Sequence, residues 1–274
     1  MTEVYLTDNE VDLLKHDFLS QYGYDFTQYS HASFRRRLQR YFILTQANTF
    51  EEFRYRLLRD EAYFEEAVSQ ISVVVTGMFR DPSFYRTLRE SVLPVLATYP
   101  LVRIWHAGCA TGEEVFSMAI LLHEAKLLHK SLLYATDINP GVIEKARQGI
   151  FPISVMQQYS ANYLASGGSH DFSSYYAANY NYAKFNEELS ARIVFATHNL
   201  VTDASFNSFQ LILCRNVLIY FEKELQTRVL NLFDNSLEPL GFLGLGSKES
   251  IRFSDLAKRY TPVVAGEKLW RKSK

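Results

Sequence analysis

Residues 103–120, RIWHAGCATGEEVFSMAI, constrain the fold of this chain more than any other segment. An apolar run over residues 101–105 leads into a turn of small residues that contains Gly108 and Gly112. Apolar side chains at helical spacing follow Glu113 and Glu114. This order of strand, glycine loop and helix is typical of the first half of a nucleotide-binding βαβ unit.

A second strand pattern lies in residues 132–139, LLYATDIN. Its apolar run ends in Asp137, which follows the glycine loop by roughly the 20 or more residues usual for such units. A carboxylate at the end of the second strand can accept hydrogen bonds from ribose hydroxyls. The two segments together predict a site for a nucleoside.

The glycine loop matches neither of two common phosphate-binding patterns. Ala110 stands where the dinucleotide fingerprint requires its second glycine, and no Lys-Ser or Lys-Thr pair follows Gly112. Carboxylates at residues 113 and 114 would repel a pyrophosphate, but they suit a nucleoside with a cationic substituent. S-adenosylmethionine, which carries a sulfonium and an ammonium group, fits that description. The alternative is an ordinary strand-to-helix turn with acidic residues at the helix N-terminus.

Composition excludes several classes of function. The 274 residues carry a net charge of −1, which argues against nucleic acid as the main partner. The two cysteines, Cys109 and Cys214, indicate neither a disulfide framework nor a metal cluster. No signal-peptide pattern and no apolar run of membrane-spanning length are present, so we expect a cytoplasmic protein without membrane insertion.

Residues 1–70 are predicted to form a small helical domain, with cap signals at Thr7 and Thr49. In its arginine-rich helix, Arg36, Arg37 and Arg40 fall on one face at spacings of three and four. A solvated charged face is one interpretation of this pattern. A docking face for an acidic partner helix is the other.

Residues 71–84 are predicted to be a linker, because the β-branched run over residues 71–75 is poor helix material. It ends in a predicted helix cap at Asp81, with Pro82 at the first helical position. Strand and helix patterns alternate over residues 85–274 and end in a hairpin around Gly266. This predicts an α/β domain whose sheet is mostly parallel with an antiparallel edge strand.

Residues 152–192 depart from this alternation and are rich in tyrosine. Two β-like runs, residues 180–185 and 191–196, flank a short polar stretch. We predict a small antiparallel β excursion from the main sheet. An aromatic-rich insertion without a partner is the alternative.

Several motifs in residues 76–250 together resemble one family, the CheR family of S-adenosylmethionine-dependent protein-glutamate O-methyltransferases of bacterial chemotaxis. The matching segments are TGMFRDPSFY, IWHAGCATGEEVFSMAI, ATDINPGVIEKARQGIF, HNL, ILCRNVLIYF and GLGSKES. AGCATGEE and CRNVLIYF are the most specific of these. The N-terminal helical part and its arginine helix also match, so the resemblance covers nearly the whole chain.

The resemblance implies a Rossmann-like methyltransferase domain that binds S-adenosylmethionine and releases S-adenosylhomocysteine. Glu114, with Glu113 beside it, is expected to hold the amino-acid end of the cofactor, and Asp137 to bind the ribose. The further cofactor-binding residues that it implies are Thr76, Arg80, Asn199, Leu200, Asn216 and Val217. Catalytic roles fall to Arg80 and Tyr220.

The chain departs from the family pattern at a few positions. Val74 stands where many members have Asn, which removes one expected hydrogen bond to the cofactor. Met78 replaces the first Phe of a Phe-Phe-Arg run, and Leu240 stands where a glycine is common. None of these changes removes a charged group that the chemistry needs.

The implied reaction is attack of a glutamate carboxylate on the sulfonium methyl group. A glutamate side chain with a pKa of about 4.3 is already ionised at neutral pH, so no general base is required. Positioning is required instead. We expect Arg80 to hold one carboxylate oxygen and Tyr220 to orient the group near the methyl. A structural salt bridge from Arg80 to Asp137 or Glu113 is the alternative.

The resemblance also implies the partner, the cytoplasmic helical bundle of a chemoreceptor, docked on Arg36, Arg37 and Arg40. We expect a monomer that does not depend on a receptor C-terminal tether, because the tyrosine-rich region lacks the glycine-containing loop of tether binders. The rival interpretations are a non-catalytic binding module and a carboxyl methyltransferase of a non-chemotaxis protein. A nucleic-acid methyltransferase is disfavoured, because residues 215–218 read RNVL and not Asn/Asp-Pro-Pro-aromatic.

Overall fold

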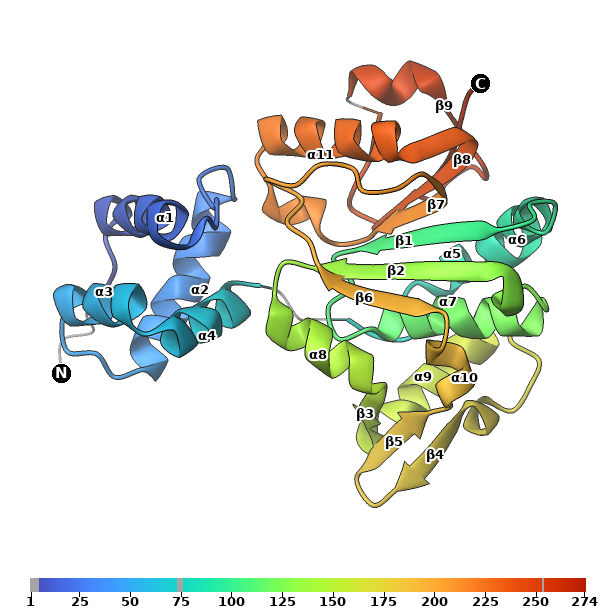
Figure 1. The fold of residues 1–274 in the computed structure, drawn as a ribbon, viewed down its shortest axis with the longest axis horizontal. Helices are drawn as coiled ribbons and strands as arrows, with labels where there is room; N and C mark the ends of the chain where they lie inside the picture. Colours follow the sequence, from blue (N-terminus) through green and yellow to red (C-terminus); the bar gives the residue numbers. More distant parts are fainter. Residues whose placement is uncertain (1–4, 73–75, 253) are drawn as a thin grey trace. The chain divides into compact units, whose positions relative to one another are not determined.

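The computed structural model describes residues 5–72, 76–252 and 254–274. The chain divides into two compact units, each with its own core (Figure 1). The first comprises Met1–Val74 and Tyr220–Arg228, and the second comprises Val75–Ile219 and Val229–Lys274. The boundaries predicted from the sequence are different, because they leave residues 220–228 in the second domain and treat residues 71–84 as a separate linker. Val74 lies outside the described residues.

Helices α1 to α4 build the first unit, and polar residues before them fix where they begin. Thr7 and Thr49 each accept a hydrogen bond from the backbone N–H three residues later, which confirms both predicted caps. Asp60 caps α4 in the same way through the N–H of Tyr63. The bounds are α1 Asp8–Tyr22, α2 His31–Leu44, α3 Phe50–Arg59 and α4 Glu61–Ile71.

Aromatic side chains fill the core of this unit. Phe18 of α1 makes edge contacts with Phe26, Phe34 and Phe64, with ring centroids 5.0–6.4 Å apart. All four side chains are buried. Edge-to-face pairs of this kind add about 0.5–1.5 kcal/mol each beyond the apolar area that they bury.

Residues 220–228 join the first unit through backbone pairing. The N–H of Ser30 donates to the carbonyl of Tyr220 at 2.8 Å, and the N–H of Glu222 donates to the carbonyl of Gln28 at 2.9 Å. Between them, Tyr29 and Phe221 form an isolated antiparallel bridge with their rings in edge contact. This segment contains the end of the η5 turn, Leu218–Tyr220, and the start of α11, Lys223–Ser236.

The second unit is organised around a sheet whose described strands run in the order β6-β2-β1-β7-β8-β10-β9 (Figure 1). Strands β6, β2, β1, β7 and β8 are parallel, whereas β10 and β9 pair antiparallel at one edge. This confirms the predicted sheet. The bounds are β1 Val102–Ala107, β2 Ser131–Asp137, β6 Ile193–Thr197, β7 Phe209–Cys214, β8 Leu237–Leu245, β9 Tyr260–Pro262 and β10 Leu269–Lys272.

Helices cover both faces of this sheet. Ile104 of β1 belongs to the core cluster that contains the apolar residues of α7, Glu113–Glu124. The adjacent Trp105 packs against Phe209 and against Phe233 of α11. Neighbouring strand residues point to opposite faces, so α7 and α11 lie on opposite sides of the sheet. Other helical segments of this unit are α5 Pro82–Thr87, η1 Leu88–Val92, α6 Leu93–Leu96, η2 Leu128–Lys130, α8 Pro140–Gln148, α9 Met156–Ala165 and η6 Asp255–Arg259.

The predicted β excursion is present, but its pairing differs from the prediction. Strand β5, Tyr182–Phe185, pairs antiparallel with β4, Tyr176–Asn179, and with β3, Ile150–Pro152. The run at residues 191–196 does not pair with it and instead contributes β6 to the main sheet. The short helix α10, Glu187–Ser190, separates the two, and η3 Ile153–Val155 and η4 Phe172–Tyr175 complete this region.

No helix in the described part of the chain is long and apolar enough to cross a membrane.

Candidate active site

The polar residues predicted from the sequence gather where the parallel strands end. Asp137 is the last residue of β2, the glycine loop follows β1, and Asn216 is the second residue after β7. Neighbouring parallel strands end at the same edge of a sheet, so these segments meet there. This edge is the usual ligand position in open α/β sheets.

The glycine loop approaches the end of β7 very closely. Gly108 has a φ of +76°, and a β-carbon on it would lie 2.4 Å from the Cγ2 atom of Val217. Only glycine fits there, because both the backbone angle and the contact exclude a side chain. Gly112, with a φ of +96°, forms the N-cap of α7. The loop thus fixes the positions of Glu113 and Glu114, the first two residues of α7.

Glu114 lies beneath the loop and is held from both sides. His106 Nδ1 lies 2.9 Å from its Oε1, and Arg215 Nη1 lies 3.4 Å from its Oε2. Burial acts to raise the pKa of the Glu114 carboxyl, but the His106 hydrogen bond and the Arg215 charge outweigh it, so the pKa is lowered. The group is therefore a fixed anion at neutral pH.

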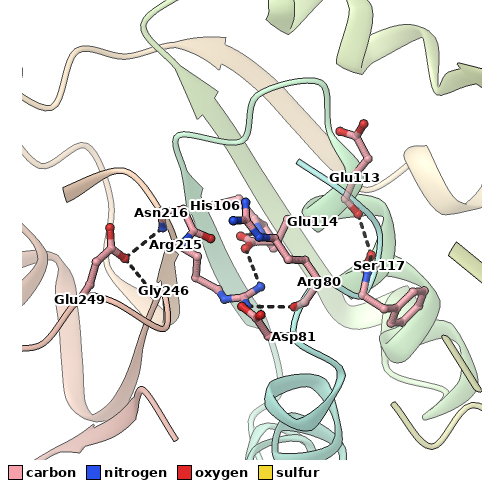
Figure 2. Close-up of polar contacts among 11 residues, drawn as sticks. Arg80, Asp81, His106, Glu113, Glu114, Ser117, Arg215, Asn216, Gly246 and Glu249 are labelled. Carbon is pink, nitrogen blue, oxygen red and sulfur yellow. Dashed lines mark hydrogen bonds and ion pairs between the residues drawn. The ribbon is translucent and has the colours of Figure 1, made fainter. Parts of the chain in front are cut away.

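Glu113 points elsewhere, although it is the adjacent residue (Figure 2). Its buried carboxylate accepts hydrogen bonds from the hydroxyls of Thr111 at 2.7 Å and Tyr159 at 3.3 Å. Burial raises the pKa of Glu113 above its usual value. Of the two predicted carboxylates, Glu114 pairs with Arg215 after β7, whereas Glu113 accepts from Thr111 and Tyr159.

Arg215 connects the end of β7 to the segment that carries Arg80 (Figure 2). Its Nη2 donates to the carbonyl oxygen of Arg80 at 2.9 Å and to Oδ2 of Asp81 at 2.7 Å. The sequence analysis predicts Asp81 as a helix cap, but its side chain makes no cap hydrogen bond, and it pairs with Arg215 instead. The predicted Pro82 at the first helical position is confirmed.

The described part of the linker is also anchored to two helices. The N–H of Phe79 donates to Ser117 Oγ of α7 at 3.0 Å, and Ser117 in turn donates to the Glu113 carbonyl at 2.7 Å. Asn162 of α9 donates to the carbonyl of Met78 at 3.0 Å. Thr76 and Arg80 are both half-buried on this anchored segment.

Asp137 accepts two backbone hydrogen bonds that fix its carboxylate. The N–H of Ala110 donates to Oδ2 at 3.0 Å, and the N–H of Asn139 donates to Oδ1 at 3.1 Å. Burial raises its pKa, and these backbone hydrogen bonds act in the opposite direction. Each oxygen has a second lone pair, so the carboxylate keeps the capacity to accept from a ligand hydroxyl.

Asn199 and Leu200 follow β6 in a short turn. The Asn199 side chain accepts from the N–H of Val201 at 2.9 Å, and its own N–H donates to Asp203. Leu200 is buried. The turn presents the half-buried Asn199 at the same sheet edge.

The turn after β7 is held by a carboxylate that the sequence analysis does not predict. Glu249 accepts from the N–H groups of Gly246 at 2.6 Å, Asn216 at 3.0 Å and Ile219 at 3.3 Å. Asn216 adopts a φ of +64°, which is uncommon for a residue other than glycine. Glu249 thereby fixes the backbone at Asn216, and Val217 follows directly.

Tyr220 and the predicted docking arginines belong to the first unit. The guanidinium of Arg37 lies 5.4 Å from the Tyr220 ring centroid, in a cation–π arrangement. Burial lowers the pKa of Arg37. Arg36 and Arg40 are exposed on α2. The three arginines therefore do not share one solvent-facing surface.

Sequence reasoning missed His106, Arg215 and Glu249. One signal was present, since Arg215 directly follows the apolar run LILC, and a charge beside a buried strand is rarely left unpaired. His106 and Glu249 carry no comparable local signal, because their roles depend on which loops meet at the sheet edge.

The site combines two carboxylates in fixed positions with a glycine loop that lies close to the segment after β7. Glu114 can attract a cationic group, and Asp137 can accept from hydroxyls. Across the described residues, no cluster of three or more His, Cys, Asp or Glu side chains could hold a metal ion.

Comparisons with known proteins agree on one family. The model of the CheR methyltransferase SAM binding domain matches residues 74–264, and that of the CheR methyltransferase all-alpha domain matches residues 9–72. A putative methyltransferase Cher3 from Pseudomonas putida is 44% identical over 273 residues, 100% of each chain. Chemotaxis protein methyltransferase 2 from Pseudomonas aeruginosa is 32% identical over 78% of this chain and 76% of that protein.

Among solved structures, the N-methyltransferase NodS from Bradyrhizobium japonicum, in complex with S-adenosyl-L-homocysteine, covers 83% of this chain and 100% of that chain. Its TM-score is 0.41 at 15% sequence identity.

Proposed function

The chain belongs to the CheR methyltransferase family and contains its S-adenosylmethionine-binding domain, and from this premise we propose that it methylates glutamate side chains of methyl-accepting chemotaxis receptors. The products are glutamate methyl esters and S-adenosylhomocysteine. Relatives named chemotaxis protein methyltransferase support this choice of substrate.

The observation that carries the proposal is the arrangement of charge at the sheet edge. Glu114 is a half-buried, fixed anion, and Asp137 is a second carboxylate with free acceptor capacity. A cationic nucleoside with ribose hydroxyls matches both. The orphaned Nδ2 of Asn139, buried without a partner among the described residues, adds a donor close to Asp137 in the chain. These residues fit S-adenosylmethionine.

We assign the binding roles accordingly. Glu114 attracts the ammonium group, Asp137 takes the ribose, and Asn199 with Leu200 lines the adenine. Asn216 and Val217, whose backbone is fixed by Glu249 and by contact with Gly108, line the side near the sulfonium. Thr76 lies on the anchored linker and closes over the cofactor. Glu113 lies beside Glu114 in the same glycine-loop motif and is assigned to the amino-acid end of the cofactor with it.

When bound, the cofactor supplies an electrophilic methyl group on a sulfonium. A carboxylate oxygen of the substrate forms the new C–O bond while the C–S bond breaks, and its electron pair returns to sulfur. The substrate carboxylate is ionised at neutral pH, so this chain needs to supply no base. Its contribution is alignment and exclusion of water.

We propose that Arg80 holds one oxygen of the substrate carboxylate by a charge-assisted hydrogen bond and leaves the other free to attack. Tyr220 orients the attacking group. The anchoring of the Arg80 backbone by Arg215 supports this role, since alignment requires a fixed donor.

The test is transfer of tritiated methyl from S-adenosylmethionine into membranes that carry chemotaxis receptors, followed by mild alkali. We expect volatile methanol released from a receptor-sized band. Arg80→Ala should reduce incorporation at least about a hundredfold and keep affinity for S-adenosylhomocysteine within about tenfold. Calorimetry with S-adenosylhomocysteine measures the second quantity.

Each other outcome has a distinct meaning. No incorporation with tight S-adenosylhomocysteine binding would overturn the receptor substrate in favour of another protein target or a non-catalytic module. Alkali-stable label would contradict ester formation. Unchanged turnover in Arg80→Ala would remove the catalytic role of that residue.

A further inference from the structure

The guanidinium of Arg215 is buried between two parts of the candidate site. Its side chain is only 3% exposed, whereas its partner Asp81 is 40% exposed. One nitrogen faces the linker, and another faces α7 (Figure 2).

On the linker side, Arg215 stabilises a turn whose backbone conformation is unfavourable for the residues that form it. Phe79 and Asp81 adopt φ values of +51° and +59°. The left-handed conformation costs a residue with a side chain about 1 kcal/mol or more. Arg215 Nη2 bonds both the Arg80 carbonyl and the Asp81 carboxylate, so it fixes the backbone that directly follows the Arg80 Cα.

On the helix side, Arg215 Nη1 contacts Oε2 of Glu114 at 3.4 Å, while His106 holds Oε1. The carboxylate is therefore prevented from rotating. Rotation would change the direction in which it attracts a cation.

Only an arginine can make this set of contacts. The plane lies over the Phe84 ring at 4.3 Å and near the Tyr85 ring at 5.6 Å. Stacking of this kind and donation in two directions need a planar fork, whereas a lysine ammonium is a single point charge.

We propose that Arg215 is a positioning residue that aligns the Arg80 backbone through Asp81 and the Glu114 carboxylate through a direct contact, so that substrate alignment and cofactor binding depend on one buried side chain. This proposal rests on the proposed function, because it takes Arg80 and Glu114 as the groups that hold substrate and cofactor.

The contacts of Arg215 with the linker and its contact with Glu114, here called the linker arm and the Glu114 arm, can be separated by substitution. Asp81→Asn keeps the shape and tolerates the left-handed backbone, but it removes the charge on the linker side alone. We expect kcat to fall about tenfold and the Kd for S-adenosylhomocysteine to stay within about twofold. Arg215→Met disturbs both arms, so kcat should fall about a hundredfold and the Kd should rise about tenfold. Arg215→Lys should not restore either.

Arg89→Met is the matched control. Arg89 is a half-buried arginine of the second unit, with a side chain 17% exposed, which pairs with Glu124 away from the candidate site. Its loss should lower the melting temperature but leave kcat and the Kd within about twofold of the unaltered chain. The double variant Asp81→Asn/Arg215→Met should have the kcat of Arg215→Met alone, because Asp81 acts on kcat only through its contact with Arg215.

Several results would overturn the proposal. These are a Kd loss in Asp81→Asn equal to that in Arg215→Met, an additive double variant, or an effect of Arg89→Met on kcat as large as that of Arg215→Met. If Arg215→Met does not fold, Arg215→Lys and the kcat-to-Kd split in Asp81→Asn decide. Failure of the unaltered chain to transfer methyl would overturn the proposed function, and the Kd values would still test the Glu114 arm.

Discussion

Glu113 and Glu114 are neighbours in the chain, yet their surroundings act on them in opposite directions. Burial raises the pKa of Glu113, and the hydroxyls of Thr111 and Tyr159 offset this only in part. At Glu114 burial acts the same way, but His106 and Arg215 reverse the outcome, so that its pKa is lowered. One carboxylate therefore costs stability when it is ionised, and the other contributes stability.

This difference predicts a pH-dependent effect of Glu113→Gln. The pKa of Glu113 is higher in the folded state than in the unfolded state. The free energy of unfolding therefore decreases as pH rises from the unfolded-state pKa to the folded-state pKa, and it stays lowered at higher pH. Glutamine removes the charge and can still bond both hydroxyls. The variant should be more stable than the unaltered chain at pH 7–8, and the gap should close as pH falls toward about 4.3.

Urea unfolding followed by tryptophan fluorescence measures this, because Trp105 and Trp270 are both buried in the second unit. Glu114→Gln is the control and should lose stability at pH 7–8, the loss shrinking as pH falls. A stabilisation by Glu113→Gln that grows toward acid would contradict the assignment.

At the scale of elements, β8 is irregular where it pairs with β7. Phe209 pairs with Leu237 and Leu211 with Phe242, so β8 carries extra residues against β7. Within them Leu240 has a φ of +66°. The position where family members often have glycine is therefore one that needs a left-handed backbone.

Leu240→Gly should consequently stabilise the second unit by about 1 kcal/mol, because glycine relieves the strain of the left-handed conformation. Leu240→Ala is the matched control, since it removes the same side chain without relieving the strain. Urea midpoints of both variants give the comparison. A glycine variant no more stable than the alanine variant would show that the strain is not the governing term.

The elements also show where sequence reasoning succeeds and where it stops. Local signals predicted the caps at Thr7 and Thr49, the glycine loop and the strand that ends in Asp137, because each depends on residues close in the chain. The pairing of β5 was wrong, because strand partners are chosen by distant hydrophobic contacts. The Arg215 contacts were missed for the same reason, since Arg80 and Asp81 lie more than a hundred residues away.

At the scale of the whole molecule, the CRNVLIYF motif is divided between the two units. Its residues up to Ile219 belong to the second unit, whereas Tyr220 and the residues after it belong to the first. The helical unit thus has two tasks in the proposed function: it holds the segment of Tyr220, and it carries the exposed arginines of α2.

The arginine helix separates these tasks by residue. Arg37 lies against Tyr220, and Arg35 pairs with Asp8 at 2.8 Å. Arg36 and Arg40, four residues apart on one exposed face, are left for the docking of an acidic receptor helix. We therefore expect the docking effect to be confined to these two.

Charge reversal of both, Arg36→Glu/Arg40→Glu, should raise the KM for receptor membranes at least about tenfold, since like charges across an interface repel. Affinity for S-adenosylhomocysteine is a property of the second unit and should not change. Lys145→Glu/Lys258→Glu is the matched control, because it reverses two exposed cations of the second unit and alters the net charge equally. An equal KM increase in both variants would reveal long-range attraction in place of a docking face, and no increase in either would exclude docking through α2. A KM increase confined to Arg36→Glu/Arg40→Glu would identify these two arginines as the charges that meet the receptor. Added salt should then also weaken receptor binding by the unaltered chain.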